Sequence, residues 1–525
     1  MEKKQKLFST GEFCAGAGGA TIGFSEYFEH KWLNDFDNTC CKTLELNFPT
    51  SEIINEDINK LDFTEEKYQN LPFVFIGSPC QAFSYAGKRE GMKDPRGMVL
   101  FRFIEFLEKA KPKTFLIENV TGLVHHDDGN TLDSLIRDME ELNYYVKYEI
   151  LNASYYNVPQ KRERVFIFGS QLDNDFDYPE HSGTPMILRN VLDNIVDNDI
   201  TVKYSDIKIQ MYKLIPPGGC WKDLPVKLQK KYLGNEYNSG GGKTGILHRL
   251  SWDKPALTLL TTPSQKRTER CHPDEIRPLT VKEYARIQTF PDDYKLYGSS
   301  NQQYKQIGNA VPVNLAKAIA KQVNEYLTER KCIIDDPLNT PLQVAIKKSK
   351  PSFDKLEKEY KKKIEILDEE VDIFKKIFDI TYLKITEEEW IKNEKARKLD
   401  KSINNQIGYI HQTILGNADN WINLDNDKVL KKKYKVDLCS KDFTIFVELK
   451  NKYNTMNCAS KTETTRRLQN IKSLHPNSRV IIAAINSEKN YVSDGIEYMN
   501  GYYIYKLVFG YPCFMELFNW LNTEF

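Results

Sequence analysis

The N-terminal third of the chain repeats one pattern, in which a short apolar run leads into a loop and then into apolar residues at helical spacing. The apolar runs, each predicted as a strand that enters a loop, are LFSTGEFCAGAGG, FVFIGSPC, TFLIENV and RVFIFG. The segments LFRFIEFLEKA and LDSLIRDMEEL lie between them and have the spacing of helices. Alternating strands and helices predict an α/β fold, a doubly wound parallel sheet that binds ligands at the carboxyl ends of its strands.

The pattern is lost from about residue 175 to 275, where PPGG, SGGGKTG and isolated aromatic residues predict a loop-rich lobe. Helical spacing returns after Arg277, in TVKEYARIQTF and NLAKAIAKQVNEYL. We therefore expect residues 1–175 and 276–330 to form one catalytic domain, interrupted by a lobe at residues 176–275.

A second domain is predicted at the C-terminal end. A polar stretch with Pro337, Pro341 and Pro351, followed by charged residues with helical spacing, predicts a linker and helical segment at residues 331–400. Residues 401–525 then form a second α/β domain, whose predicted strands are YKVDLCS, TIFVELK, VIIAAI and YYIYKLVF.

Composition narrows the classes of protein. Hydrophobic residues make up 40% of the 525 residues, enough for sizeable cores, and the net charge is only +1, so any basic surface must be local. The ten cysteines contain no CxxC pair, which argues against a zinc knuckle. We find neither an apolar signal core at the N-terminus nor an apolar run of about 18 residues, so we expect a cytoplasmic protein with reduced thiols and no membrane partner.

The loop FCAGAGGATIGF lies between a predicted strand and a predicted helix. Its glycines allow a tight turn and a close approach of the backbone to a ligand, although an ordinary turn would look the same. Asp35 follows at about the distance expected of a carboxylate that binds a ribose, and Phe36 beside it could stack on an adenine ring. The order and spacing favour a nucleoside site, for which the candidates are Phe13, Cys14, Gly16, Gly18, Gly19, Asp35, Phe36, Asp57 and Ile58.

Candidate catalytic residues follow the later strands. Cys80 lies after a buried strand, in a loop that Pro79 stiffens, but a lone cysteine is more often an inert small hydrophobe. Glu118 ends a strongly apolar strand, where burial would raise the pKa of a carboxyl group. The further candidates Asn119, Gln160, Arg162 and Arg164 stand in IENV and QKRERVF.

The ordered set FCAGAGG, PCQ, ENV, QxRxR, RPLTxxEYARIQTFPD and GNAVP resembles the bacterial DNA (cytosine-5) methyltransferase family. The resemblance covers residues 7 to about 328 and implies a Rossmann-like sheet that binds S-adenosyl-L-methionine, with a target recognition lobe.

The resemblance also implies a mechanism. The thiolate of Cys80 attacks carbon 6 of a flipped cytosine, and carbon 5 then takes the methyl group. Glu118 holds or protonates ring nitrogen 3, and Asn119 fixes that loop. Arg162 stabilises the ring carbonyl, and Arg164 supports Arg162 and Glu118.

Further residues are assigned through the same resemblance. The loop after Cys80 would close over the base. Each basic residue of the lobe could contact DNA or could equally be an ordinary solvated surface charge. Arg277 and Arg286 stand in a motif that is mainly structural. Phosphate contacts are expected of Lys227, Lys230 and Lys231. The other DNA candidates are Gln81, Ser84, Lys88, Arg89, Gln160, Lys266, Arg267 and Arg270, and the other cofactor candidates are Pro79, Leu100, Asn309 and Ala310.

The C-terminal domain carries a different motif. Asp437 precedes a ten-residue interval, after which Glu448 and Lys450 flank one residue of a predicted strand and so share a face. Two carboxylates beside a lysine can hold Mg²⁺ and activate water for phosphodiester cleavage. The arrangement resembles the PD-(D/E)xK nuclease superfamily, with Val436 where proline is usual, and D…ExK alone is a weak motif.

The two resemblances together imply a methyltransferase and a type II restriction endonuclease in one chain, with double-stranded DNA as partner. NKYNTMN resembles a group of restriction enzymes and implies a palindrome of GGNCC or GGWCC type, with the nuclease half dimeric on DNA. Two kinds of alternative remain open: a C-terminal domain that only binds DNA or recruits a separate nuclease, and a transfer RNA methyltransferase. The length of the recognition lobe argues for DNA.

Overall fold

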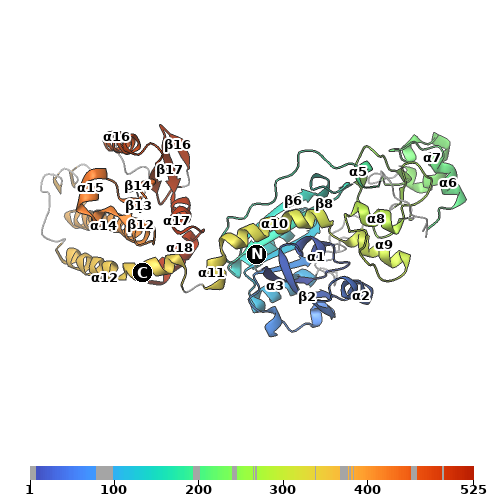
Figure 1. Ribbon diagram of the computed structural model, residues 1–525, viewed down its shortest axis with the longest axis horizontal. Coiled ribbons are helices and arrows are strands. Elements are labelled where there is room, and N and C mark those ends of the chain that lie inside the picture. Colours follow the sequence, from blue (N-terminus) through green and yellow to red (C-terminus); the bar gives the residue numbers. More distant parts are fainter. Residues whose placement is uncertain are drawn as a thin grey trace. The chain divides into compact units, whose positions relative to one another are not determined.

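The structure is a computed structural model of the whole chain, and it divides into two compact units, residues 1–328 and 329–525 (Figure 1). It describes residues 7–78, 98–192, 202–238, 245–263, 265, 269–336, 339–366, 376–377, 380–381, 384–450, 458–487 and 490–524.

The first unit is built on a seven-stranded sheet with the order β3-β2-β1-β4-β5-β8-β6. The strands are β1 (Phe8–Phe13), β2 (Phe28–Asp35), β3 (Glu52–Asn55), β4 (Phe73–Gly77), β5 (Thr114–Val120), β6 (Tyr145–Asn152) and β8 (Glu163–Ser170). β1 to β5 pair in parallel, whereas β8 runs antiparallel to both β5 and β6. The predicted doubly wound sheet is confirmed, but it is mixed rather than wholly parallel.

Helices cover both faces of this sheet. The helices are α1 (Gly19–Phe24), α2 (Asn38–Asn47), α3 (Met98–Ala110), α4 (Asn130–Glu141) and α10 (Val313–Glu329). α3 and α4 pack Phe103, Phe106 and Leu135 on one face, against Val74 and Ile76 of β4. The alternate residues of β4 face α1, where Phe24 lies 5.1 Å from the ring centre of Phe75. β4 is apolar throughout because both of its faces are buried.

The loop-rich lobe contains short elements: α5 (Arg189–Leu192), α6 (Asp206–Tyr212), α7 (Val226–Leu233), β9 (His248–Arg249), β10 (Ala256–Leu257) and β11 (Arg270–Cys271). It has its own core around Tyr212, Trp221 and Leu247. β10 pairs with β7 (Gln160–Lys161), which joins the lobe to the strands of the catalytic domain. The chain then returns through α8 (Val281–Ile287) and α9 (Ser300–Asn309).

The second unit has a six-stranded sheet with the order β12-β13-β14-β15-β17-β16. The strands are β12 (Trp421–Asn423), β13 (Leu438–Ser440), β14 (Ile445–Lys450), β15 (Arg479–Ala484), β16 (Tyr491–Ser493) and β17 (Ile496–Asn500). β13 and β14 pair antiparallel, and β14, β15 and β17 are parallel. The hairpin expected between the Asp437 and Glu448 segments is therefore present.

Two cores, one on each face of this sheet, stabilise the second unit. The helices are α11 (Lys331–Asp335), α12 (Pro341–Ile366), α14 (Glu387–Gly416), α15 (Lys428–Tyr434), α16 (Cys458–Leu474), α17 (Gly501–Phe509) and α18 (Phe514–Glu524). α12 contributes Leu342 to one core, with Val447 of β14. α15 and α16 contribute Tyr434 and Leu468 to the other core, with Phe446 of β14. Figure 1 shows α12 and α16 on opposite sides of the strands.

The strand predicted at YYIYKLVF is wrong, because this segment is helix α17. The Asn500 side chain accepts from the Tyr503 N–H at its start, and Gly510 ends it with φ +78°. Its buried residues Ile504, Tyr505 and Val508 recur at helical spacing on one face. Aromatic and β-branched residues favour strands locally, but here tertiary packing overrides that preference.

Candidate functional site

The glycine loop after β1 has the shape expected of a ligand-binding turn. Gly16 and Gly18 have φ values of +56° and +73°, which side chains other than glycine rarely adopt. A Cβ on Gly18 would lie 2.7 Å from the Tyr294 hydroxyl, so this glycine is required by packing. A Cβ on Gly16 would meet nothing within 4 Å, so its backbone faces open space that a ligand can enter.

Asp35, at the end of β2, holds this loop in place. One carboxylate oxygen accepts the Gly16 N–H at 2.8 Å, and the other accepts the Asp37 N–H at 2.8 Å. Burial raises the pKa of Asp35, while these two hydrogen bonds oppose the rise. The neighbouring Phe36 is 71% exposed, which is unusual for an aromatic ring and leaves its face free to stack. The chemistry of this set fits an adenosine-containing cofactor, because an acid, a bare backbone and a ring meet at one sheet edge.

The other cofactor candidates lie around the same edge. Asp57 accepts the N–H of Asn59 and so fixes the turn after β3. The Cys14 thiol is partly buried beside Asp35 and Asp57, and desolvation raises its pKa far above the usual range, so it stays protonated. Asn309 is exposed. The candidates buried in this region are Phe13, Ile58, Leu100 and Ala310, and Gly19 opens α1.

Glu118 and Asn119 lie at the carboxyl end of β5, beside the end of β4. The Asn119 side-chain amide donates to the Ser78 hydroxyl at 2.8 Å, and that hydroxyl donates to the Glu118 carbonyl oxygen at 3.2 Å. Ser78 is the last described residue before the segment that carries Cys80. Asn119 therefore ties the end of β5 to the last described residue before the segment that carries Cys80.

Arg162, between β7 and β8, and Arg164, in β8, have different surroundings. Arg164 Nε lies 3.0 Å from Glu118 Oε1, and the two side chains are 14% and 9% exposed. Arg162 is buried and donates to the backbone carbonyls of Gly308 at 3.1 Å and Asn309 at 3.3 Å. The structure therefore brings Arg164, not Arg162, to the Glu118 carboxylate. Arg162 instead connects the strand to the GNAVP segment.

Two of the DNA candidates are buried, which corrects the expectation that they touch DNA. Gln160 is 0% exposed, donates to the Gln288 side chain at 2.9 Å and accepts the Leu259 N–H at 2.9 Å. Arg270 is buried in the lobe and donates to the Thr258 carbonyl oxygen at 3.1 Å. Gln160 thus connects the catalytic domain to the lobe, whereas the hydrogen bonds of Arg270 stay within the lobe. The candidates that lie outside the described residues are Pro79, Cys80, Gln81, Ser84, Lys88, Arg89, Lys266 and Arg267.

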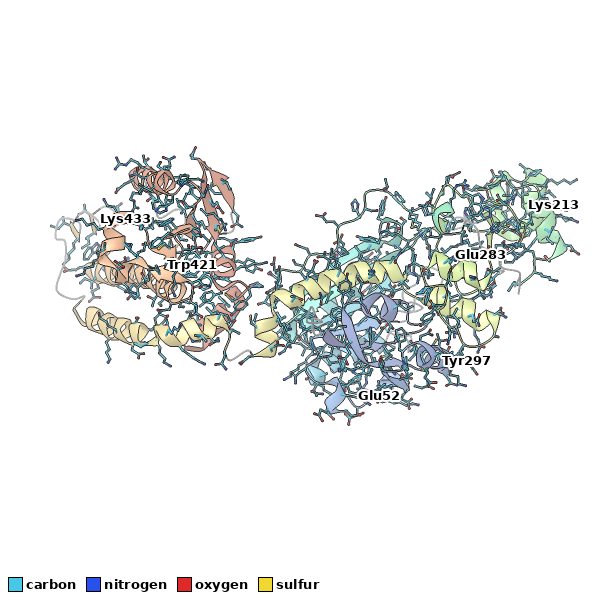
Figure 2. All side chains as sticks on the ribbon, in the orientation of Figure 1. Glu52, Lys213, Glu283, Tyr297, Trp421 and Lys433 are labelled. Carbon is cyan, nitrogen blue, oxygen red and sulfur yellow. The ribbon has the colours of Figure 1, made fainter. Side chains whose placement is uncertain are left out.

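The other charged candidates of the first unit are either exposed on the surface or held in ion pairs inside the fold. Lys227, Lys230 and Lys231 are exposed on α7. Arg277 donates to both carboxylate oxygens of Glu283 at 2.8 Å, and Glu283 in turn caps α8 (Figure 2). This bidentate pair at the base of the lobe supports a structural role for Arg277.

The second unit brings its three candidates together at the β13–β14 hairpin. Asp437 directly precedes β13, and its carboxylate accepts the Leu449 N–H at 2.8 Å. The Lys450 amine donates to Glu448 Oε1 at 2.7 Å, so these two side chains share a face of β14 as expected. Burial raises the pKa of Glu448, and the negative charge of the nearby Asp437 raises it further.

Two further cations complete this cluster, and sequence reasoning missed both. The Lys431 amine lies 3.2 Å from Asp437 and 2.8 Å from Asp425. Arg467 of α16 lies 3.4 Å from Glu448 Oε1. The lysine run KKKYK, which ends two residues before Asp437, was a signal for the first, whereas only the folded α16 reveals the second.

The donor set of the hairpin fits a divalent cation. Within the described residues no three His, Cys, Asp or Glu side chains cluster as a complete metal cage. Mg²⁺ in nucleases needs only one or two carboxylates, with water and phosphate as its other ligands. Asp437 and Glu448 supply two, and a cation between them would relieve the repulsion that raises the pKa of Glu448.

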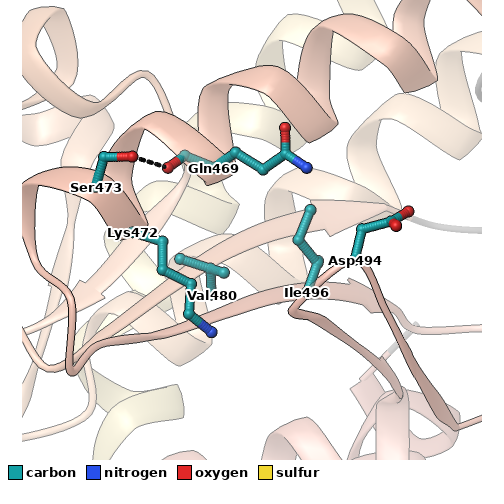
Figure 3. Close-up of a pocket in the computed structure, with 6 residues that line it drawn as sticks. All are labelled: Gln469, Lys472, Ser473, Val480, Asp494 and Ile496. Atoms are coloured by element: carbon teal, nitrogen blue, oxygen red, sulfur yellow. Dashed lines mark hydrogen bonds between the residues drawn. The ribbon is translucent and has the colours of Figure 1, made fainter.

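A cavity of about 240 Å³ lies elsewhere in the second unit (Figure 3). Neither the glycine loop nor the hairpin site contributes to it. The lining residues are Gln469, Lys472, Ser473, Val480, Asp494 and Ile496. In the part of the chain that is described, no helix is both long and apolar enough to cross a membrane.

Comparison with known proteins matches each unit to a family. Residues 8–325 match the C-5 cytosine-specific DNA methylase family, and residues 335–521 match the Eco47II restriction endonuclease family. The type II methyltransferase M.Sau96I of Staphylococcus aureus is 44% identical over 335 residues, which are 62% of this chain and 78% of that protein. The type II methyltransferase M.Eco47II of Escherichia coli is 43% identical over 61% of this chain and 80% of its own length.

Among solved structures, the methyltransferase EhMeth of Entamoeba histolytica aligns with 62% of this chain and 99% of its own, at 18% identity and a TM-score of 0.48. The family match covers more than half of the chain and includes the strands that carry Glu118 and Arg164. The chain is an enzyme that belongs to the C-5 cytosine-specific DNA methylase family and carries, in the same polypeptide, an Eco47II-type restriction endonuclease domain.

Proposed function

We propose that the chain is a complete restriction-modification enzyme: it methylates carbon 5 of a cytosine within a specific duplex sequence and cleaves DNA that lacks this mark. The observation that carries the methyltransferase half is the Arg164–Glu118 pair at 3.0 Å, beside the Asn119–Ser78 hydrogen bond that leads to Cys80. The two family matches on one chain support the pairing of activities.

Carbon 5 of cytosine is a poor nucleophile until carbon 6 is attacked. The Cys80 thiolate would form a bond to carbon 6, which gives carbon 5 the character of an enamine. After carbon 5 has taken the methyl group, loss of its proton and release of the Cys80 thiolate would restore the aromatic ring. The Glu118 carboxyl group would hold or protonate ring nitrogen 3, so that charge does not build up on the ring. The target base must leave the helical stack to reach these groups.

We assign the ring carbonyl to Arg164 rather than to Arg162. Arg164 is the arginine beside Glu118, so a base held by Glu118 is within its reach. Arg162 donates to backbone carbonyls instead and fixes the segment at Gly308 and Asn309. Asn119 would act as a positioning residue that orients the Cys80 loop through Ser78.

The donor pocket is proposed at the glycine loop. S-adenosyl-L-methionine supplies the electrophilic methyl group when it is bound. The open backbone at Gly16 would accept the cofactor, and each Asp35 oxygen keeps a lone pair that can accept a ribose hydroxyl. Phe36 would stack on the adenine, and its 71% exposure provides the surface.

The hairpin site is proposed to cleave phosphodiesters. Asp437 and Glu448 would hold Mg²⁺, which activates water and neutralises charge at the scissile phosphate. Lys450 would stabilise the negative charge that develops on the phosphate. A palindromic target, of GGNCC or GGWCC type, has one scissile bond in each strand, so we propose that two copies act together.

The test is incubation of the purified chain with tritiated S-adenosyl-L-methionine and either duplex DNA or transfer RNA, with EDTA present. We expect label in duplex DNA only, and label in transfer RNA would contradict the assignment. Addition of Mg²⁺ without methyl donor should then cut unmethylated plasmid at discrete sites. A folded chain that methylates but never cuts would mean that the second unit only binds DNA or recruits a nuclease.

A further inference from the structure

Helix α15 presents a concentrated positive surface in the second unit. Residues 428–435 contain five lysines and no acidic residue. Lys428, Lys432, Lys433 and Lys435 are exposed, as is Val429 at 77% between them. Figure 2 labels Lys433 on this helix. These five residues are called the α15 face below.

The amines of the α15 face lack acidic partners in the described part of the chain, and that of Lys433 lies 4.8 Å from the ring centre of Tyr434. Within the described part of the chain no carboxylate lies within ion-pair distance of Lys428, Lys432, Lys433 or Lys435, whereas Lys431 of the same helix pairs with Asp425 and Asp437. Four neighbouring cations without counter-ions repel one another, which costs stability unless an anion approaches. A solvated surface would distribute such charges among acids, as α12 does with its Lys348–Asp419 pair.

Helix α15 is linked to both carboxylates of the hairpin site, to Asp437 from its middle and to Glu448 through Arg467 at its C-terminal end. Lys431 donates to Asp437 at 3.2 Å and to the Val436 carbonyl oxygen at 3.0 Å. Arg467 donates both to the carbonyl oxygen of Lys435, which ends the helix, and to Glu448. The α15 face is therefore held in a fixed position relative to Asp437 and Glu448.

We propose that the α15 face binds the phosphate backbone of the duplex that the second unit cleaves, next to the scissile phosphate. This inference rests on the proposed nuclease function and names its DNA contact. A helix of this length spans about 10 Å, or about three phosphates along one DNA strand at about 3.4 Å of rise each. Lysine on a flexible stem suits such contacts, because it reads charge rather than base identity.

The first test compares two triple variants of the full chain. Lys428→Gln/Lys432→Gln/Lys433→Gln removes three charges from the α15 face. The matched control removes three exposed lysines from α12, which packs on the other face of the sheet: Lys347→Gln/Lys350→Gln/Lys355→Gln.

Cleavage kcat/KM is measured between 50 and 200 mM salt, with methyl transfer on the same DNA as an internal reference. Each lost phosphate contact makes the negative slope of log K against log salt shallower by about 0.9. The slope for the α15 triple variant should therefore be shallower than that of the wild type by about 2.7. We expect cleavage KM to rise at least about 10-fold at 100 mM salt, with kcat at saturating DNA unchanged and methyl transfer within about 2-fold. Equal slopes for the α15 triple and the wild type, or the same loss in the α12 control, would overturn the proposal.

The second test does not depend on cleavage. A photo-crosslinking amino acid in place of Val429 should attach to duplex DNA, whereas the same group in place of Lys347 should not. Attachment at position 429 in a chain that fails to cut would uphold the α15 face and refute the nuclease proposal. A chain that cuts normally but shows no attachment at 429 would refute the α15 face and leave the nuclease proposal standing.

Discussion

Replacement of Arg164 by methionine should disable methyl transfer and expose the energetic coupling between Arg164 and Glu118. The Arg164 guanidinium lies 3.0 Å from the carboxylate of Glu118, and both side chains are less than 15% exposed. Removing the cation leaves a buried carboxylate without its partner. In addition, the proposed mechanism loses the donor that faces the ring carbonyl.

The two losses have separate magnitudes. Breaking a buried ion pair from one side costs about 3–5 kcal/mol, and we expect about 3 kcal/mol because the site opens to substrate. Loss of one donor to a developing negative charge lowers kcat by about 100- to 1000-fold. The double variant Glu118→Gln/Arg164→Met contains no unpaired charge. Its loss in free energy of unfolding should therefore be smaller than the sum of the two single losses by about 2 kcal/mol.

The assay is a double-mutant cycle on the free energy of unfolding of the first unit, with tritium transfer measured on each variant. Arg162→Met is the control, because Arg162 holds backbone carbonyls rather than Glu118. It should destabilise the unit without coupling to Glu118→Gln. Additive effects of Glu118→Gln and Arg164→Met, or normal methyl transfer in Arg164→Met, would refute the assignment of Arg164 to the catalytic pair.

Three other outcomes are expected. Cys80→Ser should abolish methyl transfer and leave S-adenosyl-L-methionine binding by calorimetry nearly unchanged; retained transfer would exclude Cys80 as nucleophile. Asp437→Ala and Lys450→Ala should each remove cleavage, and a loss of methylation in either folded variant would contradict independent sites. Burial raises the pKa of Glu12 to about 8, so the folded state retains a proton that the unfolded chain loses above about pH 4.5. Wild-type stability should therefore fall relative to Glu12→Gln by about 1.4 kcal/mol per pH unit between pH 5 and 8, and a difference that does not vary with pH would disprove that burial effect.

Much of the first unit follows from its sequence. Strands such as FVFIG and TFLIENV are buried on both faces of the sheet. A short, continuous apolar run is typical of such a central strand, so the sequence predicts it well. The site residues follow because the carboxyl ends of parallel strands meet at one edge, where Asp35 and Glu118 both lie. The antiparallel direction of β8 is not encoded in any local pattern, since both directions bury the same apolar residues.

The sequence could not show whether a given polar side chain is buried or exposed to solvent. Gln160 and Arg270 have the chemistry of DNA contacts, but both side chains are buried. Arg162 and Arg164 are two residues apart and indistinguishable by type, and only the pairing of β8 with β5 brings Arg164 to Glu118. The segment of α17 was predicted as a strand because its aromatic residues favour strands locally. Its caps and its packing favour a helix instead.

The most direct test of the central claim compares the position of the methyl mark with the position of the cut. DNA from cells that express Asp437→Ala is sequenced after bisulfite treatment, and unmethylated plasmid cut by the wild-type chain is sequenced at its ends. We predict one short palindrome in both data sets, and resistance to cutting once that palindrome is methylated. Methylation and cleavage at unrelated sequences, or equal cutting of methylated and unmethylated plasmid, would contradict a single-chain restriction-modification enzyme.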